Sequence, residues 1–290
     1  MKYRLLLALA MAWCCWSPAM AQDDLQDLFG EEPATADYAI ATFKTTRIIL
    51  GQSVELPPSG EMIFVISHHF GKVNSGLKEF FGLDQSTVRL GLEYGLHDRV
   101  GLSIGRSSFN KMVDGGVKVS LLRQQKGTTS IPVTAVLYSS VNIKSIPWAI
   151  PEYDYLFAHR ISYVHQLLVA RKFNANLSLQ ITPTLVHYNL VPLKKDYNDI
   201  PAVGFGGRFK ILPRLTINGE YYYIPEKFRI ADSDPSLSIG FDLETGGHVF
   251  QLFFTNSYAI YDPGFIAETY GKWGKGDVYF GFNITRVFTL

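Results

Sequence analysis

The sequence contains only two cysteines, Cys14 and Cys15, and both lie in a stretch that we expect to be removed on export. The mature chain then has no cysteine, which excludes disulfides, thiolate metal sites and cysteine nucleophiles. Trp13 precedes the pair, and its bulk does not fit the small-residue cleavage site of a lipoprotein. We therefore do not expect lipidation.

The first 21 residues have the features of a secretory signal peptide. Lys2 and Arg4 precede an apolar run over residues 5–16, and Ala19 and Ala21 have the spacing that signal peptidase recognises. The apolar run is shorter than the roughly 20 residues that a membrane-spanning helix needs, so an anchor helix is the weaker interpretation. We predict cleavage after Ala21.

The remaining 269 residues lack both a long apolar run and an excess of one charge. No apolar stretch reaches 18 residues, which excludes a transmembrane helix. Without the signal peptide, 25 basic and 26 acidic residues remain. This balance does not favour nucleic acid or an acidic substrate as a partner.

The chain is rich in strand-forming and turn-forming residues, with 16 Tyr, 20 Phe and 25 Gly. Apolar side chains alternate with other residues along several segments, at 88–95, 176–182, 203–210 and 237–244. This period of two predicts strands with one apolar face. The alternation alone does not distinguish a soluble sandwich from a membrane barrel.

Breaks between these strands follow a pattern. Short breaks at 97–98, 125–130, 172–174, 212–213 and 244–247 interleave with long breaks at 71–85, 108–115, 144–156, 190–200, 225–235 and 258–276. Eleven breaks divide twelve strands. The pattern predicts an all-β fold, an antiparallel up-and-down transmembrane barrel of about 12 strands, with long outer loops and short periplasmic turns. With the signal peptide, it indicates the outer membrane of a Gram-negative bacterium.

A further candidate strand at Thr42–Leu50 would make thirteen. Because an even number of strands brings both termini to the periplasm, we place this segment in the periplasm or inside the lumen rather than in the wall. The predicted organisation is a signal peptide at 1–21, a periplasmic or lumen-entering segment at 22–60 and a barrel at 61–290.

The last predicted strand, Asp277–Phe288, is amphipathic and has an aromatic residue near its end. This arrangement resembles the signal that outer-membrane barrels present to the barrel-insertion machinery. Arg286 interrupts the apolar face, but near the lipid headgroups it would cost only about 0–1 kcal/mol.

Five strings together resemble a family of bacterial β-barrel proteins catalogued only as a domain of unknown function. They begin at Ala41 (ATFKTTRII), Phe80 (FFGLD), Gly105 (GRSSFNK), Thr245 (TGGHVFQL) and Gly281 (GFNITRVF). The resemblance spans about residues 38–290 and implies a barrel fold. It implies no activity, cofactor or catalytic residue.

Two patterns in the sequence could carry chemistry. His68 and His69 are adjacent, so on a strand they point to opposite faces and cannot share one metal. A lipid hydrolase would use a Ser and a His on neighbouring strands, but the chain has no Gly-x-Ser-x-Gly elbow. We therefore predict no catalytic site, no metal site and no cofactor.

The string from Gly105 to Lys111 is a candidate anion-binding loop. Arg106, Ser107, Asn110 and Lys111 could hold a phosphate or sulfate, for example of lipopolysaccharide. The alternative is a strand-to-loop turn in which Arg106 pairs with a luminal acid. The expected partners are accordingly membrane lipid and lipopolysaccharide.

The polar faces of the strands predict a charged lumen. The candidate luminal residues are Arg89, Glu93, Lys118, Arg160, Arg208, Lys210, Glu220 and Asp242. They would line a passive channel for small solutes, or they would pair and close the lumen of a structural or receptor barrel. A barrel of twelve strands is intermediate in size between barrels filled by side chains and barrels with an open channel. The strand number therefore does not decide between these two possibilities. We favour the channel, with the lipid hydrolase as the third possibility, and the solute is not specified by the sequence.

Overall fold

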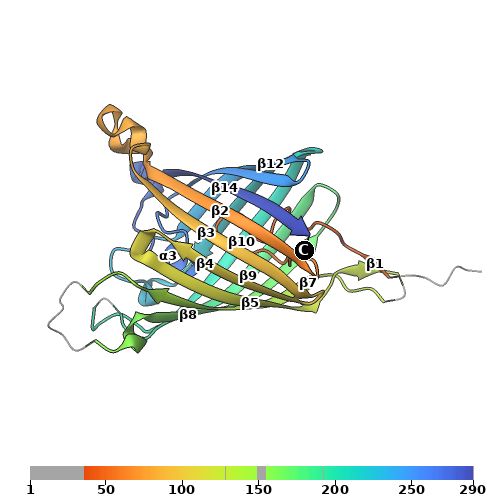
Figure 1. Cartoon of the computed structure of the whole chain (residues 1–290), viewed down its shortest axis with the longest axis horizontal. Helices are drawn as coiled ribbons and strands as arrows, with labels where there is room; N and C mark the ends of the chain where they lie inside the picture. Colours follow the sequence, from red (N-terminus) through yellow and green to blue (C-terminus); the bar gives the residue numbers. More distant parts are fainter. Residues whose placement is uncertain (1–35, 128, 149–154, 192, 290) are drawn as a thin grey trace, which may run out of the picture. The chain divides into compact units, whose positions relative to one another are not determined.

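The computed structural model describes residues 36–127, 129–148, 155–191 and 193–289. The predicted signal peptide, residues 22–35 and residues 149–154 of a predicted outer loop lie outside the described residues. Twelve antiparallel strands form a closed barrel, which confirms the predicted fold class (Figure 1). Two short strands, β1 (Asp37–Tyr38) and β6 (Gln125–Lys126), form a separate two-stranded sheet.

The wall strands are β2 (Glu61–Lys72), β3 (Ser86–His97), β4 (Val100–Ser107), β5 (Met112–Leu122), β7 (Thr134–Lys144), β8 (Ile161–Lys172), β9 (Leu177–Tyr188), β10 (Asp199–Leu212), β11 (Leu215–Tyr223), β12 (Ser236–Thr245), β13 (His248–Thr255) and β14 (Tyr279–Thr289). The barrel closes where β14 pairs with β2, for example Ile284 with Ile66. Each remaining wall strand pairs with its sequence neighbours, so both edges of every strand are hydrogen-bonded.

Long connections lie at one end of the barrel and carry the short helices. These are η1 (Val73–Ser75), η2 (Leu77–Gly82), η3 (Phe109–Lys111), η4 (Phe157–Arg160), η5 (Glu226–Phe228), α3 (Asp262–Ala267) and η6 (Trp273–Lys275). No helix among the described residues has the length and apolar character needed to span a bilayer.

One predicted loop is shorter than expected. We predicted a break over 108–115, but β5 already begins at Met112. Gly115, the last residue of the predicted break, is therefore a strand residue. Its neighbour Gly116 lacks a side chain for a packing reason, because a Cβ there would lie 2.8 Å from Cε2 of Tyr138. Gly116 thus marks a close approach of the Tyr138 ring to the strand backbone rather than a turn.

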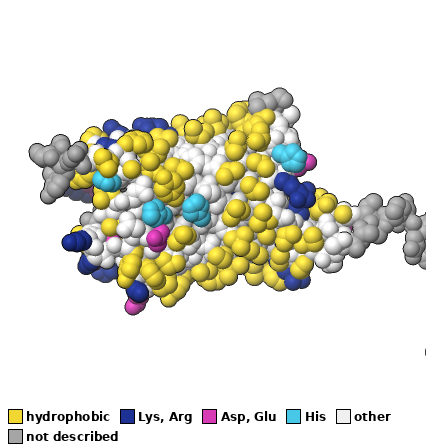
Figure 2. Space-filling view, turned by 90° about the horizontal axis from the view of Figure 1, so that it is seen from below, with side chains coloured by type: hydrophobic (Ala, Val, Ile, Leu, Met, Phe, Trp, Pro, Cys, Tyr) yellow, Lys and Arg dark blue, Asp and Glu magenta, His cyan; other side chains and the backbone are white. Residues whose placement is uncertain are grey.

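The apolar faces of the strands point outward. On β3, Leu90 and Leu92 are 50% and 41% exposed, whereas Arg89 and Glu93 are buried. Figure 2 shows hydrophobic side chains covering much of the barrel wall, with charged groups mainly toward its ends. The predicted assignment of faces, apolar to lipid and polar to the lumen, agrees with this burial.

The last strand follows the same rule. Gly281, Asn283 and Thr285 are buried inside, while Arg286 is exposed. The Arg286 guanidinium lies 4.9 Å from the ring centroid of Phe288, so it packs on an aromatic near the strand end.

Candidate functional site

Residues 41–56, which we call the luminal segment, lie inside the barrel. Most of them are buried, including Ile49 and Leu50 at 1% and 2% exposure. The segment turns back on itself, since the amide of Ser53 donates to the Thr46 carbonyl at 2.9 Å. Within the described residues, no β-ladder joins it to a wall strand. Its backbone groups therefore need other partners.

Glu220 on β11 binds the tip of the luminal segment. Its carboxylate accepts hydrogen bonds from the backbone amides of Ile49 (3.2 Å), Leu50 (2.8 Å) and Gly51 (3.0 Å). A Cβ at Gly51 would collide with the Tyr222 hydroxyl, so a larger residue does not fit there. A buried charge is thus matched by three donors of the segment.

Lys118 on β5 provides the complementary contact. Its ammonium donates to the backbone carbonyls of Thr46 (2.7 Å), Ser53 (2.9 Å) and Glu55 (3.1 Å). An ammonium has three donors and no acceptor, so these bonds use its full capacity. Glu220 and Lys118 therefore bind opposite kinds of backbone group on the same segment.

Polar side chains from four other strands complete the contacts. They donate to carbonyls of the segment: Gln180 to Gln52 at 2.8 Å, Gln251 to Ile48 at 2.8 Å, Asn283 to Ile49 at 2.9 Å, and Arg208 to Ala41 at 2.8 Å. The luminal segment is thus held from around the barrel by side chains rather than by strand pairing.

The outer loop that carries α3 also enters the lumen. All six residues of α3 are buried, and Phe265 and Ile266 join the hydrophobic cluster that contains Ile48, Ile49 and Leu50. The luminal segment and this loop therefore share one core inside the barrel.

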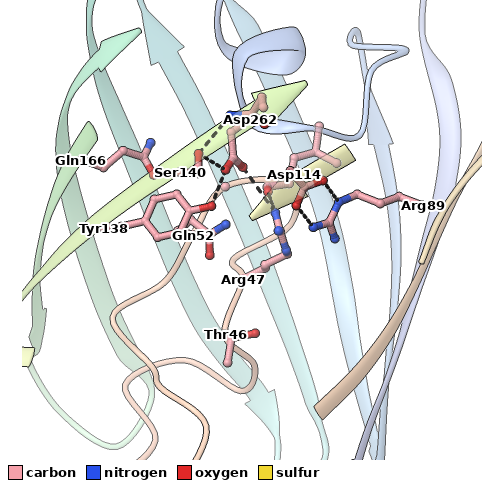
Figure 3. A network of polar contacts seen from close by, with 12 residues as sticks. Thr46, Arg47, Gln52, Arg89, Asp114, Tyr138, Ser140, Gln166 and Asp262 are labelled. Atoms are coloured by element: carbon pink, nitrogen blue, oxygen red, sulfur yellow. Dashed lines mark hydrogen bonds and ion pairs between the residues drawn. The ribbon is translucent and has the colours of Figure 1, made fainter. Parts of the chain in front are cut away.

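A polar network joins the luminal segment to α3 (Figure 3). The Arg47 guanidinium lies 3.6 Å from the Asp262 carboxylate. It also lies 4.0 Å from the Glu93 carboxylate. The Tyr138 hydroxyl donates to the other Asp262 oxygen at 2.6 Å, and Ser140 lies 3.4 Å from it. Asp262 thus connects α3 by polar contacts to both the segment and the wall.

Arg89 and Asp114 form a separate buried ion pair on β3 and β5. The Arg89 Nε lies 3.0 Å from one Asp114 oxygen, and a terminal nitrogen binds the other, so the pair is bidentate (Figure 3). Arg89 is 2% exposed. A Cβ at Gly105 would collide with this guanidinium, which explains the glycine.

Most predicted luminal residues lie on the inner face. Buried there are Arg89, Glu93, Lys118, Arg208, Glu220 and Asp242, and Lys210 is half-buried on the same face of β10. The prediction that Arg160 lines the lumen is wrong. It lies on η4 in an outer loop, where its guanidinium sits 4.4 Å from the Trp148 ring and donates to the carbonyls of Lys144 and Ile146. The strand begins only after it, at Ile161.

The predicted anion-binding loop is not assembled as one site. Arg106 and Ser107 are consecutive strand residues, so Arg106 is exposed on the outside and Ser107 is buried inside. The Asn110 amide donates to the Tyr261 hydroxyl at 2.6 Å, and Lys111 is exposed. The alternation of a strand therefore separates the first two residues from each other.

Asp262, Tyr138 and Gln180 were not anticipated as site residues. Tyr138 and Gln180 lie on strands with alternating burial, and that alternation could have placed them inside. Asp262 lies in a loop, where no periodic pattern applies. In the part of the chain that the structure describes, no group of three His, Cys, Asp or Glu residues could hold a metal ion.

Comparisons with known proteins find similar barrels among solved structures. The NanC porin covers 79% of this chain and 99% of its own, with 9% identity and a TM-score of 0.49. The KdgM porin in complex with disordered oligogalacturonate has 10% identity, coverage of 78% and 99%, and a TM-score of 0.46. LpxR from Salmonella typhimurium has 9% identity, coverage of 79% and 100%, and a TM-score of 0.37. No curated protein sequence matches the chain.

A family model described as a membrane bound beta barrel domain of unknown function matches residues 43–288. The match includes most of the luminal segment as well as every wall strand. It confirms the resemblance drawn from the five sequence strings. The chain therefore belongs to the membrane bound beta barrel domain family DUF5777.

Proposed function

We propose that this protein is a porin-like channel of the outer membrane for small polar solutes, closed in the described state by its luminal segment. The observation that carries the proposal is the way the segment is held. Its backbone is bound by side chains of separate strands, among them Glu220, Lys118 and Gln180. Such contacts can be released without breaking a wall strand.

The wall behind the segment supports a water-filled path. Its inward residues include Thr182, Ser238, Gln251 and Asn283, all buried and polar. Water can replace the segment as their hydrogen-bond partner, whereas an apolar interior would not favour hydration. A barrel of 12 strands is wider than barrels of about 8 strands, which side chains fill, and narrower than barrels of about 16–18 strands, which leave an open channel.

The alternative is a structural or receptor barrel whose lumen stays closed. The same contacts support it, because a segment bound by several buried polar groups can also be permanent. The two proposals differ in one consequence: only the channel contains a continuous path once the segment is removed.

Removal of the luminal segment is expected to produce stepwise currents. A variant whose mature chain begins at Ser59 keeps all wall strands, since β2 begins at Glu61. In planar bilayers, this variant should conduct in discrete steps, whereas the full mature chain should be closed for most of the recording.

Folding of the truncated variant is checked independently by heat-shifted gel mobility. A truncated barrel that folds and inserts but gives no stepwise current would refute the channel and leave the structural or receptor barrel.

A lipid hydrolase receives little support from the structure. Ser139 Oγ and His165 Nδ1 lie 2.9 Å apart on neighbouring strands, on the outward face. However, Ser139 is the sixth residue of the 11-residue β7, at the middle of the strand. Lipid ester groups lie at the edges of a hydrocarbon layer about 30 Å thick, not at its middle. The contact is better explained as two polar groups that satisfy each other in an apolar surface.

A further inference from the structure

A cavity of about 210 Å³ lies at the end of the barrel that carries the long loops. Its lining comes from η3, the end of β7, the chain on both sides of α3 and the start of β14. It includes Phe109, Asn110, Lys144, Tyr258, Tyr270 and Tyr279. Nothing in the channel proposal uses this cavity.

The lining combines aromatic rings with hydrogen-bond donors. Tyr270 is 52% exposed and presents both a ring and a hydroxyl. Lys144 is exposed, and within the described residues its ammonium has no hydrogen bond or ion pair. Small-molecule sites have this character, mainly aromatic with a few polar groups that orient the ligand. The open cation favours a ligand that carries an anionic acceptor.

The one carboxyl in the lining, Glu268, is engaged by tyrosine hydroxyls of the protein. Glu268 is partly buried and interacts with the hydroxyls of Tyr188 and Tyr261. Burial raises the pKa of the Glu268 carboxyl above its usual value, while the Lys144 charge and the two hydroxyls oppose that shift. The Glu268 side chain is therefore directed toward tyrosines of the protein.

A second cavity of about 290 Å³ shares Asn110 and Lys144 with the first. Its lining includes Trp148 and Arg160, and the Arg160 guanidinium stacks 4.4 Å from the Trp148 ring. The adjoining cavities thus place aromatic rings on both sides of Lys144, while the Arg160 guanidinium is already bound to the carbonyls of Lys144 and Ile146.

We propose that the two cavities bind an anionic saccharide, with Lys144 at the shared wall as the contact for its carboxylate or phosphate. The ring faces of a sugar carry C–H groups that pack on aromatic rings, and its hydroxyls bond to phenols and amides. Such a saccharide could be free or could belong to lipopolysaccharide. Binding at this site does not require conduction, so its failure is distinguishable from failure of the channel.

The test is equilibrium binding to the full mature chain in detergent, with digalacturonate and glucose 6-phosphate as anionic probes and maltose as the neutral probe. At least one anionic probe should bind more tightly than maltose. Lys144→Met should weaken that binding by about 10-fold or more, because a charged hydrogen bond is lost, and Lys144→Arg should retain most of it.

Lys111→Met is the matched control, since Lys111 is exposed nearby but does not line either cavity. Anionic probes that bind no better than maltose would overturn the proposal, as would loss of binding in Lys111→Met but not in Lys144→Met. Repeating the measurement in nanodiscs with and without lipopolysaccharide identifies the source. Competition by lipopolysaccharide assigns the site to lipid-borne sugar, and its absence assigns the site to a free saccharide.

Discussion

Replacement of Glu220 by glutamine should increase the fraction of time that the channel is open by roughly 10- to 100-fold. The carboxylate accepts bonds from the amides of Ile49, Leu50 and Gly51 inside the barrel. Glutamine has nearly the same shape but no charge, and its amide group presents donors to these donors. Each charged hydrogen bond contributes about 1.5–3 kcal/mol, and 1.4 kcal/mol corresponds to a tenfold change in population. Single-channel recording measures the open fraction directly.

Glu226→Gln provides the control for this measurement. Glu226 lies on η5 in an outer loop, so the substitution removes the same charge away from the luminal segment. An equal increase in both variants would indicate a general effect of charge. Unchanged opening in Glu220→Gln would show that the bonds to Glu220 do not hold the segment.

Replacement of Arg89 by methionine should lower the free energy of unfolding by about 3–5 kcal/mol, the usual result of leaving one partner of a buried ion pair alone. Asp114 is 5% exposed, so its carboxylate cannot recover the lost contact from bulk water. Urea unfolding of the refolded barrel, followed by tryptophan fluorescence, measures the change.

The double variant Arg89→Met/Asp114→Leu separates the effect of the ion pair on stability from the effect of side-chain packing. Because it removes both charges, it should recover most of the lost stability. A double variant that is less stable than Arg89→Met would contradict this account, since the loss would then come from the side-chain volumes rather than from an uncompensated charge.

The barrel wall could be predicted from the sequence because its pattern is local. Strand residues alternate with period two, and this places Leu90 outside and Arg89 inside without knowledge of any partner. The even strand number follows from the interleaved short and long breaks, which also excluded 42–50 from the wall. The one misplaced luminal residue, Arg160, precedes its strand, and alternation cannot be extended beyond the strand end.

The arrangement inside the barrel could not be predicted in the same way. Glu220 binds backbone amides about 170 positions away in the chain, and backbone groups carry no residue-specific signal. Asp262 meets Arg47 only because the α3 loop folds inward. The four residues of the predicted anion-binding loop do not form one site for a local reason, because Arg106 and Ser107 point to opposite faces of β4. Of these four residues, only Asn110 lines the two cavities of the proposed saccharide site.

The most direct test of the account is a disulfide that locks the luminal segment to the wall. A Cβ at Gly206 would lie 3.6 Å from Cγ1 of Ile48, so Ile48→Cys and Gly206→Cys place two thiols within bonding range. The chain's own cysteines, Cys14 and Cys15, both lie in the predicted signal peptide. In the Glu220→Gln background, the oxidised pair should abolish stepwise current, and reduction should restore it. Ile48→Cys alone is the control and should have no effect; Gly206→Cys alone is not used, because its Cβ would lie 2.2 Å from Cδ1 of an unchanged Ile48. Current that persists through the fully oxidised protein would contradict the claim that the luminal segment closes the channel.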